Sequence, residues 1–269
     1  FLALEGLKER LERHPGDRGL KPARHLERLA DLPHEAFRLD DAGFIGAEDL
    51  RLARLIRGRS LATPEVRLLE LPELAAATRL RLERRLHAFT RDWVGRLLFP
   101  VRELARSEVA ALRAVAYQLE QGLGTALREP LEPSLATLDP AAQRVLSDLG
   151  IRVGRLSVFA LALANRAARA SRVTLVATLH GNAPASSARA SRGVPTPPCP
   201  RGRLPFEAWL ALGALPVGPW VLRADLAERA ADHIARGENP LRVLASLGVP
   251  RRERPRVVTA IESMLEPLR

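Results

Sequence analysis

The chain has 269 residues and a formal net charge of +11, and 46% of its residues are hydrophobic while only 4% are aromatic. At roughly 150 residues per domain, this length predicts two globular units whose cores are built mainly from Leu, Ala and Val. The single cysteine, Cys199, excludes an intrachain disulfide and a four-cysteine zinc site. No uncharged apolar run reaches the roughly 18 residues that a membrane span requires. The basic balance favours polyanionic partners such as nucleic acid.

The two ends of the chain indicate a piece of a longer protein. The first residue is Phe1, the only methionine is Met264, and no signal segment opens the chain. A single cysteine is typical of a reducing compartment, so we expect a cytoplasmic protein.

The first half of the chain predicts helices on either side of a small sheet. Leucines recur at helical spacing within residues 1–31. Residues 36–70 then change to alternating apolar and polar residues separated by turn residues, which predicts a small β-meander. A long helix is expected to begin at Pro72 and to kink or stop near Pro100, and a further helix covers about 107–121.

The second half predicts further helices, interrupted by a linker. Asp139 followed by Pro140 is typical of an N-cap with a first-position proline, and the helix that begins there should end at Gly150. Residues 156–179 are expected to be helical. Residues 181–203 are mostly Ala, Ser, Pro, Gly and Arg, a composition that is typical of a linker.

The residues after this linker predict a small helical unit. A short strand is expected at 221–223, and helices are expected over about 204–212, 225–236, 241–247 and 257–265. Asp225 is expected to cap the second of these helices. Two helices joined by a tight glycine turn resemble a helix-turn-helix or winged-helix unit. The predicted fold class is therefore mainly α, with a helical domain over 1–180 that holds a β insertion at about 36–70, a linker at 181–203, and a C-terminal domain at 204–269.

One long stretch carries most of the positive charge. From Gly150 to Phe206 the sequence has no Asp or Glu, yet it holds nine arginines and so supplies +9 of the net charge of +11. Arginines bind phosphates through bidentate hydrogen bonds. The candidate nucleic-acid-binding residues are therefore Arg152, Arg155, Arg166, Arg169, Arg172, Arg201 and Arg203. The alternative is that these arginines pair with carboxylates of residues 72–149 and hold the fold together.

The sequence contains no complete active site. It lacks the phosphate-binding G-x-x-x-x-G-K-[ST] loop, an Asp-Glu-x-His segment for Mg²⁺, the G-x-S-x-G elbow and the H-E-x-x-H zinc motif. The six histidines are scattered along the chain, so no metal-binding spacing is predicted. We therefore expect no catalytic and no metal-ligating residues within this chain.

Several segments follow one another in a characteristic order. They are AFRLDDAG at 36–43 with LARL at 52–55, SEVAALRAVAYQLEQGLG at 107–124 with LD at 138–139, LSDLGIRVG at 146–154 with FALAL at 159–163, and GPWVLRADLAER at 218–229. Their order and spacing resemble the region after the motor in bacterial superfamily-2 DExH helicases that are related to the mitochondrial degradosome RNA helicase. The resemblance covers most of residues 30–265.

This resemblance implies that the chain is the accessory C-terminal part of an ATP-dependent RNA or DNA helicase. It implies that the chain packs on the RecA-like motor lobes and lines the exit path of the single strand. Arginines would then contact the strand without sequence preference. ATP and Mg²⁺ are expected only in the motor, so no cofactor is expected in this chain, and no membrane partner is expected.

Two other functions remain open at this point. In the first alternative, the chain is a non-catalytic, arginine-rich helical scaffold that binds a protein. In the second, it is a DNA-binding regulator that uses residues 204–269. An upstream coding sequence with motor motifs would favour the helicase. Tight binding to a protein without affinity for nucleic acid would favour the scaffold, and sequence-specific binding to duplex DNA would favour the regulator.

Overall fold

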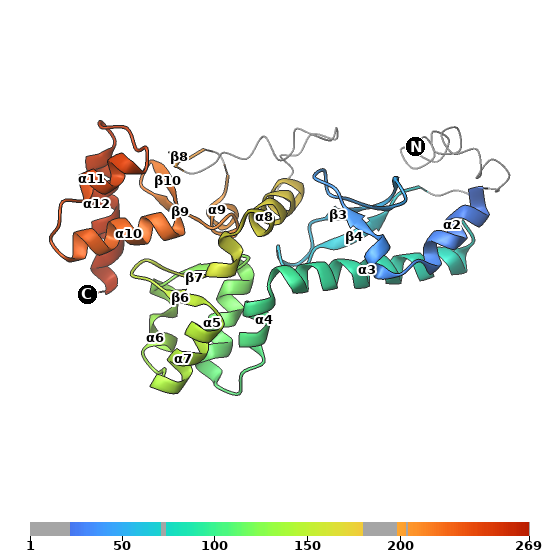
Figure 1. The fold of residues 1–269 in the computed structure, drawn as a ribbon, viewed down its shortest axis with the longest axis horizontal. Helices are drawn as coiled ribbons and strands as arrows, with labels where there is room; N and C mark the ends of the chain where they lie inside the picture. Colours follow the sequence, from blue (N-terminus) through green and yellow to red (C-terminus); the bar gives the residue numbers. More distant parts are fainter. Residues whose placement is uncertain (1–21, 71–73, 180–197, 203, 269) are drawn as a thin grey trace. The chain divides into compact units, whose positions relative to one another are not determined.

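The computed structural model describes residues 22–70, 74–179, 198–202 and 204–268 (Figure 1). Contacts within the chain divide it into two compact units. Of the described residues, unit 1 holds those up to Arg96 together with 177–179, and unit 2 holds the others. This division differs from the predicted domains, because helices of the predicted first domain share unit 2 with the C-terminal helices.

Unit 1 is built around a four-stranded antiparallel meander in the order β1-β2-β3-β4, as expected for residues 36–70. Ile45, Leu52 and Ala53 are completely buried, so the central strands supply the core. Pro72 lies outside the described residues, and the long helix after the sheet begins at Ala76. The elements are α2 (Pro22–Asp31), β1 (Arg38–Leu39), β2 (Phe44–Ala47), β3 (Leu50–Ile56), β4 (Glu65–Leu68) and α3 (Ala76–Leu97), whose last residue belongs to unit 2.

The first part of unit 2 combines short helices with a three-stranded antiparallel sheet in the order β5-β7-β6. As predicted, Asp139 caps the helix that begins at Pro140, because its Oδ1 accepts a hydrogen bond of 2.7 Å from the Ala142 N–H. The elements are α4 (Phe99–Ala105), α5 (Ala110–Gln121), β5 (Thr125–Leu127), α6 (Glu132–Leu135), α7 (Pro140–Asp148), β6 (Ile151–Val153) and β7 (Ser157–Ala160).

The helix that was predicted over 156–179 is wrong over residues 156–165. Residues 157–160 form β7, the central strand of the sheet, and α8 (Arg166–Leu179) begins only after a short 3-10 turn. All four residues of β7 are buried. A strand that is covered on both faces is a continuous apolar run, and such a run has the same sequence pattern as a buried helix segment.

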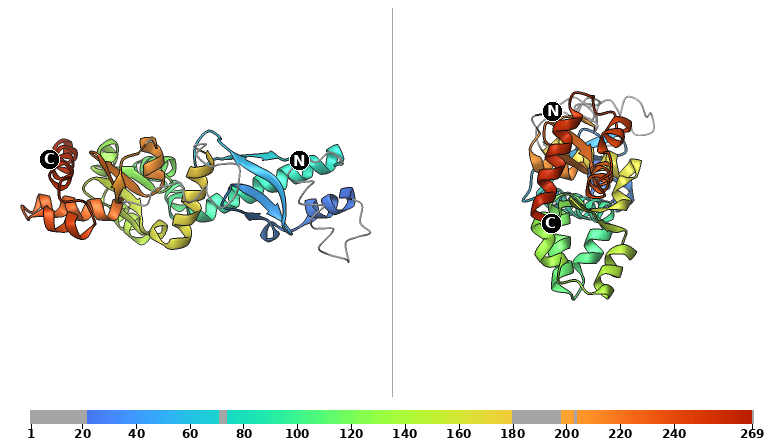
Figure 2. Two further views of the ribbon diagram at one scale, coloured as in Figure 1. Left: turned by 90° about the horizontal axis from the view of Figure 1, so that it is seen from above. Right: turned by 90° about the vertical axis from the view of Figure 1, so that its left-hand side faces the viewer.

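The C-terminal part of unit 2 adds a second three-stranded sheet in the order β8-β10-β9. Helices α10, α11 and α12 pack on one another, and α10 and α12 also pack on the β9–β10 hairpin (Figure 2). Leu215, Leu244 and Ile261 are completely buried in the core that they share. The elements are β8 (Cys199–Pro200), α9 (Phe206–Ala211), β9 (Ala214–Val217), β10 (Trp220–Arg223), α10 (Ala224–Ala235), α11 (Pro240–Ser246) and α12 (Arg254–Leu265).

Two further expectations for this part are corrected. Cys199 is not a linker residue, because it lies in β8, pairs with Val221 and is 9% exposed. Asp225 is not the cap of α10, because the N-cap position is Arg223 and no side chain caps this helix. The Asp225 carboxylate instead receives the Arg223 guanidinium, at 3.0 Å from Nε and 2.6 Å from Nη2. Most of the predicted linker, 181–197 and 203, lies outside the described residues.

Short 3-10 helices complete the described elements, at His34–Ala36, Glu129–Leu131, Leu161–Ala164 and Glu266–Leu268. None of the helices in the described part of the chain is both long enough and apolar enough to cross a membrane. The fold is thus mainly α with small antiparallel sheets, and the candidate site lies in unit 2.

Candidate nucleic-acid interface

The turn between β6 and β7 is bound to α10 by one buried carboxylate. Glu228 is 7% exposed, and it accepts hydrogen bonds from the backbone N–H groups of Arg155 (2.6 Å), Leu156 (3.1 Å) and Ser157 (2.7 Å). The Ser157 hydroxyl donates a further bond of 2.6 Å. A side-chain carbon at Gly154 would collide with the carboxylate, so this turn requires glycine. Consecutive backbone donors of this kind form an anion-binding concavity, and here the chain fills it with its own glutamate.

Burial raises the pKa of the Glu228 carboxyl above its ordinary value, while the hydrogen bonds from Ser157, Arg155 and Leu156 oppose that rise. The contact therefore has a structural role: it fixes the β6–β7 turn on α10. The donors of this turn are used inside the protein, so phosphate binding in this region depends on side chains.

The anchored turn borders an open hollow of about 680 Å³, which we call the arginine hollow. Four arginines surround it, from the end of β5, from β6, from the β6–β7 turn and from α10. Its lining residues are Arg128, Arg152, Val153, Gly154, Arg155, Phe159, Leu161, Asp225, Leu226, Glu228, Arg229 and Asp232. Of these four arginines, only Arg152 and Arg155 were predicted from the sequence as candidate binding residues.

The four arginines differ in their partners. Arg128 pairs with Glu132, at 2.7 Å from Nε to Oε2, and the Nε of Arg155 lies 2.7 Å from the Oδ1 of Asp232. Arg152 and Arg229 are exposed, and in the described part of the chain neither forms an ion pair or a side-chain hydrogen bond. These two guanidinium groups are therefore the ones that are available to phosphate oxygens.

Three other predicted site residues are exposed but do not border the arginine hollow. Arg166 and Arg169 lie in the first turn of α8, where a spacing of three residues puts them on the same face of the helix. Arg201 is exposed directly after β8. Arg203 lies outside the described residues.

Arg172 was predicted to bind nucleic acid, but its side chain is inside the protein. It is 3% exposed, and its guanidinium donates to Thr125 Oγ1 (2.9 Å), to the Leu210 carbonyl (3.1 Å) and to the Ala211 carbonyl. Burial, together with the charge of Arg169, lowers the pKa of Arg172 to about 9, so the group is still protonated at neutral pH. Because its donors are occupied between α8, β5 and α9, Arg172 is a scaffold residue.

Arg128 and Arg229 were not predicted, since both lie outside the acid-free stretch and are brought near Arg152 only by the fold. Phe159 is the only aromatic residue among the described residues that line the arginine hollow, and it is 6% exposed. The hollow therefore offers charge to a phosphate backbone and no surface on which bases could stack.

Comparison with known proteins gave no relative of this chain: no family model, no curated protein and no solved structure matches it. Within the described ranges, no three His, Cys, Asp or Glu side chains lie close enough together to hold a metal ion. The function is therefore inferred from the residues of the arginine hollow and from the sequence segments described above.

Proposed function

We propose that the chain is an accessory region of an ATP-dependent superfamily-2 helicase and that it contacts single-stranded nucleic acid at the arginine hollow. The observation that carries this proposal is the position of Arg152 and Arg229. Both are exposed, neither has an ion-pair partner within the described residues, and both border one hollow with Arg128 and Arg155.

The chemistry of the hollow favours the sugar–phosphate backbone over the bases. Guanidinium groups bind phosphate oxygens in any sequence context, and each phosphate contact releases counterions, so the affinity falls as salt rises. The exposed Arg166 and Arg169 on α8 add positive charge to the same unit. We therefore expect weak, salt-sensitive binding without sequence preference.

The helicase part of the proposal rests on the resemblance of the sequence segments, and the arginine hollow adds one supporting fact. Two of those segments, 146–154 and 218–229, are far apart in the chain, yet both border the hollow, through Arg152 to Gly154 and through Asp225 to Arg229. In this proposal the RecA-like motor lobes are the second partner, and ATP and Mg²⁺ belong to them.

Fluorescence anisotropy with labelled single-stranded DNA and RNA, measured over a series of salt concentrations, tests the proposal. The log–log slope should be about −0.7 per phosphate contacted, hence roughly −1.4 for two contacts and roughly −3 for four. Homopolymers and mixed sequences of equal length should bind alike. Absence of binding at low salt would overturn the contact with nucleic acid, and a parent gene without Walker and DExH motifs would overturn the helicase.

A DNA-binding regulator is kept as a second candidate because of the arginines around the start of α12. Arg251 and Arg252 are exposed in the turn that precedes α12, and Arg256 is exposed in its first turn. A recognition helix reads duplex DNA with residues in this position. Selection from random duplexes separates the two functions, because a strong preference for one duplex sequence over single strands would favour the regulator.

A further inference from the structure

The outer edge of β6 presents backbone groups that have no partner in the sheet. β6 is an edge strand, and the bonds that flank its pairing with β7 run from Leu161 N to Gly150 O and from Gly154 N to Ser157 O, both 2.8 Å. Hydrogen-bonded pairs alternate along an antiparallel ladder, so the N–H and C=O groups of Ile151 and Val153 point away from β7. Among the described residues, none forms a hydrogen bond with the N–H or C=O groups of Ile151 and Val153.

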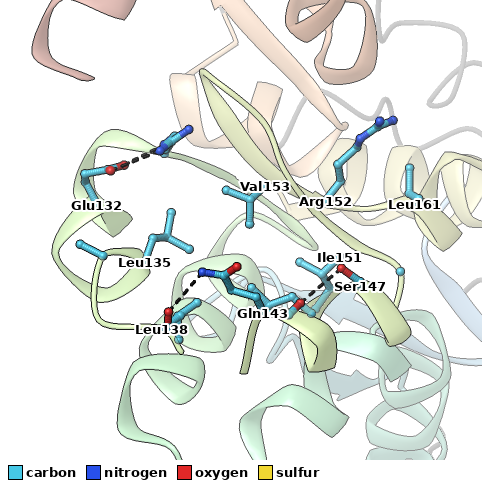
Figure 3. Close-up of a pocket in the computed structure, with 13 residues that line it drawn as sticks. Glu132, Leu135, Leu138, Gln143, Ser147, Ile151, Arg152, Val153 and Leu161 are labelled. Atoms are coloured by element: carbon cyan, nitrogen blue, oxygen red, sulfur yellow. Dashed lines mark hydrogen bonds and ion pairs between the residues drawn. The ribbon is translucent and has the colours of Figure 1, made fainter. Parts of the chain in front are cut away.

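A groove of about 620 Å³ runs along this free edge, and we call it the edge groove (Figure 3). Four consecutive residues, 150–153, line it. Successive side chains of a strand point to opposite faces, so a hollow that touches all four borders the edge of the strand itself. The remaining walls come from α6, α7, the loop between them, the end of β5 and the 3-10 turn after β7. The full lining is Arg128, Glu132, Leu135, Ala136, Leu138, Gln143, Leu146, Ser147, Gly150, Ile151, Arg152, Val153 and Leu161.

The walls of the edge groove combine apolar side chains with polar groups, and its rim is basic. Val153 and Leu161 are 39% and 47% exposed. The polar side chains in the groove are already engaged, since Gln143 Nε2 donates to the Leu138 carbonyl and Ser147 Oγ donates to the Gln143 carbonyl, both at 3.2 Å. Glu132 is neutralised by Arg128, which leaves Arg152 as the uncompensated charge.

We propose that the edge groove binds an extended peptide, which adds to the sheet as a strand beside β6. The backbone of such a partner supplies donors and acceptors for Ile151 and Val153. Apolar side chains at alternate positions of the peptide lie against the leucines of α6 and α7, and an acidic residue of the peptide pairs with Arg152. A nucleic acid fits less well, because the groove offers one uncompensated arginine and none of the described residues that line it is aromatic. The edge groove shares Arg128, Arg152, Val153 and Leu161 with the arginine hollow, so a peptide and a single strand would compete there, but the peptide site is inferred independently of the contact with nucleic acid.

Selection of random linear peptides on the whole chain, with affinities then measured by calorimetry, tests the inference. Enriched peptides should carry apolar residues at alternate positions and at least one acidic residue. Val153→Pro removes one outward N–H and leaves the ladder intact, because proline is tolerated on an edge strand where its nitrogen faces away from the sheet. Val153→Ala removes the side chain and keeps that N–H, so it is the matched control. Binding should be about tenfold or more weaker in Val153→Pro than in Val153→Ala, a difference of about 1.4 kcal/mol.

A second comparison keeps the test informative if Val153→Pro does not fold. N-methylation of alternate residues in a selected peptide removes the donors along one of its edges and leaves the protein unchanged. Methylation on the edge that faces β6 should abolish binding, and methylation on the other edge should not. The inference is overturned if no peptide is enriched, if both methylated forms bind equally well, or if single-stranded DNA, and no peptide, protects the amides of Ile151 and Val153 from hydrogen exchange. Leu135 lines the edge groove and not the arginine hollow, so Leu135→Ala should weaken peptide binding and leave binding to single strands as in the wild type, and the two proposals can fail separately.

Discussion

Glu228 and Ser157 lie 71 residues apart in the sequence, and the carboxylate of the first accepts both the backbone N–H (2.7 Å) and the hydroxyl (2.6 Å) of the second. Together with the N–H groups of Arg155 and Leu156, these donors fix the β6–β7 turn on α10. The arginine hollow is formed at this junction, so its geometry depends on the buried Glu228 carboxylate.

Replacing Glu228 by alanine should destabilise the protein strongly. The substitution leaves buried donors of Arg155, Leu156 and Ser157 without an acceptor, and each unsatisfied donor costs about 1–3 kcal/mol. We expect the free energy of unfolding in urea to fall by about 3 kcal/mol or more. Glu262→Ala, on the exposed side of α12, is the control and should change stability by less than about 0.5 kcal/mol. A loss below about 1 kcal/mol for Glu228→Ala would contradict the role of this anchor.

The same carboxyl gives a pH dependence with a defined sign. Burial raises the pKa of Glu228 in the folded protein above the ordinary value of 4.5, so the folded state binds the proton more tightly than the unfolded state. Its contribution to stability is therefore fully present below pH 4.5 and decreases as the pH rises through the folded pKa. In Glu228→Gln, position 228 no longer titrates. The free energy of unfolding of the wild type should therefore fall relative to that of the variant as the pH rises from 4.5 through the folded pKa. A carbon-detected NMR titration in which Glu228 titrates below 4.5 would refute this prediction.

Arg172→Met tests whether Arg172 stabilises the fold or contacts nucleic acid. The substitution removes the donors to Thr125 Oγ1 and to the carbonyls of Leu210 and Ala211, so we expect thermal and urea unfolding to show a loss of about 3 kcal/mol. Arg166→Gln removes an exposed guanidinium from the same helix and should change stability by less than about 0.5 kcal/mol. The affinity of the folded fraction of Arg172→Met for single strands should equal that of the wild type. A variant of normal stability that has lost its affinity would show that Arg172 is a contact residue.

Local signals in the sequence predicted some elements well and could not reach others. Asp139 and Pro140 define the start of α7 by themselves, and the alternation in 36–70 defines the meander. Strand β7 was missed because its pairing with β5 and β6 is non-local, and its apolar run has no strand period. Of the four arginines of the arginine hollow, the acid-free stretch contains Arg152 and Arg155, but Arg229 lies outside it and is brought near them by the fold, where Glu228 fixes the β6–β7 turn on α10.

The isolated chain should not hydrolyse ATP. It lacks the phosphate-cradling loop and the acidic segment that holds Mg²⁺, and these groups supply most of phosphoryl-transfer catalysis by position and charge. A coupled assay with saturating ATP, Mg²⁺ and single-stranded DNA or RNA should give the rate of a mock preparation. Sustained turnover that follows the chain through two purification steps would contradict the assignment of ATP chemistry to a separate motor.

The most direct measurement compares two double variants that lose the same charge. Arg152→Gln with Arg229→Gln removes the two unpaired guanidinium groups of the arginine hollow, whereas Arg57→Gln with Arg59→Gln removes two exposed arginines of unit 1. Anisotropy titrations with one labelled single strand should show a clear loss of affinity for the first variant only. Its log–log salt slope should be flatter by roughly 1.4, at roughly 0.7 per phosphate contact, with an unchanged melting temperature. Equal affinities and equal slopes for the two variants would mean that binding follows net charge alone, and that would contradict a site at the arginine hollow.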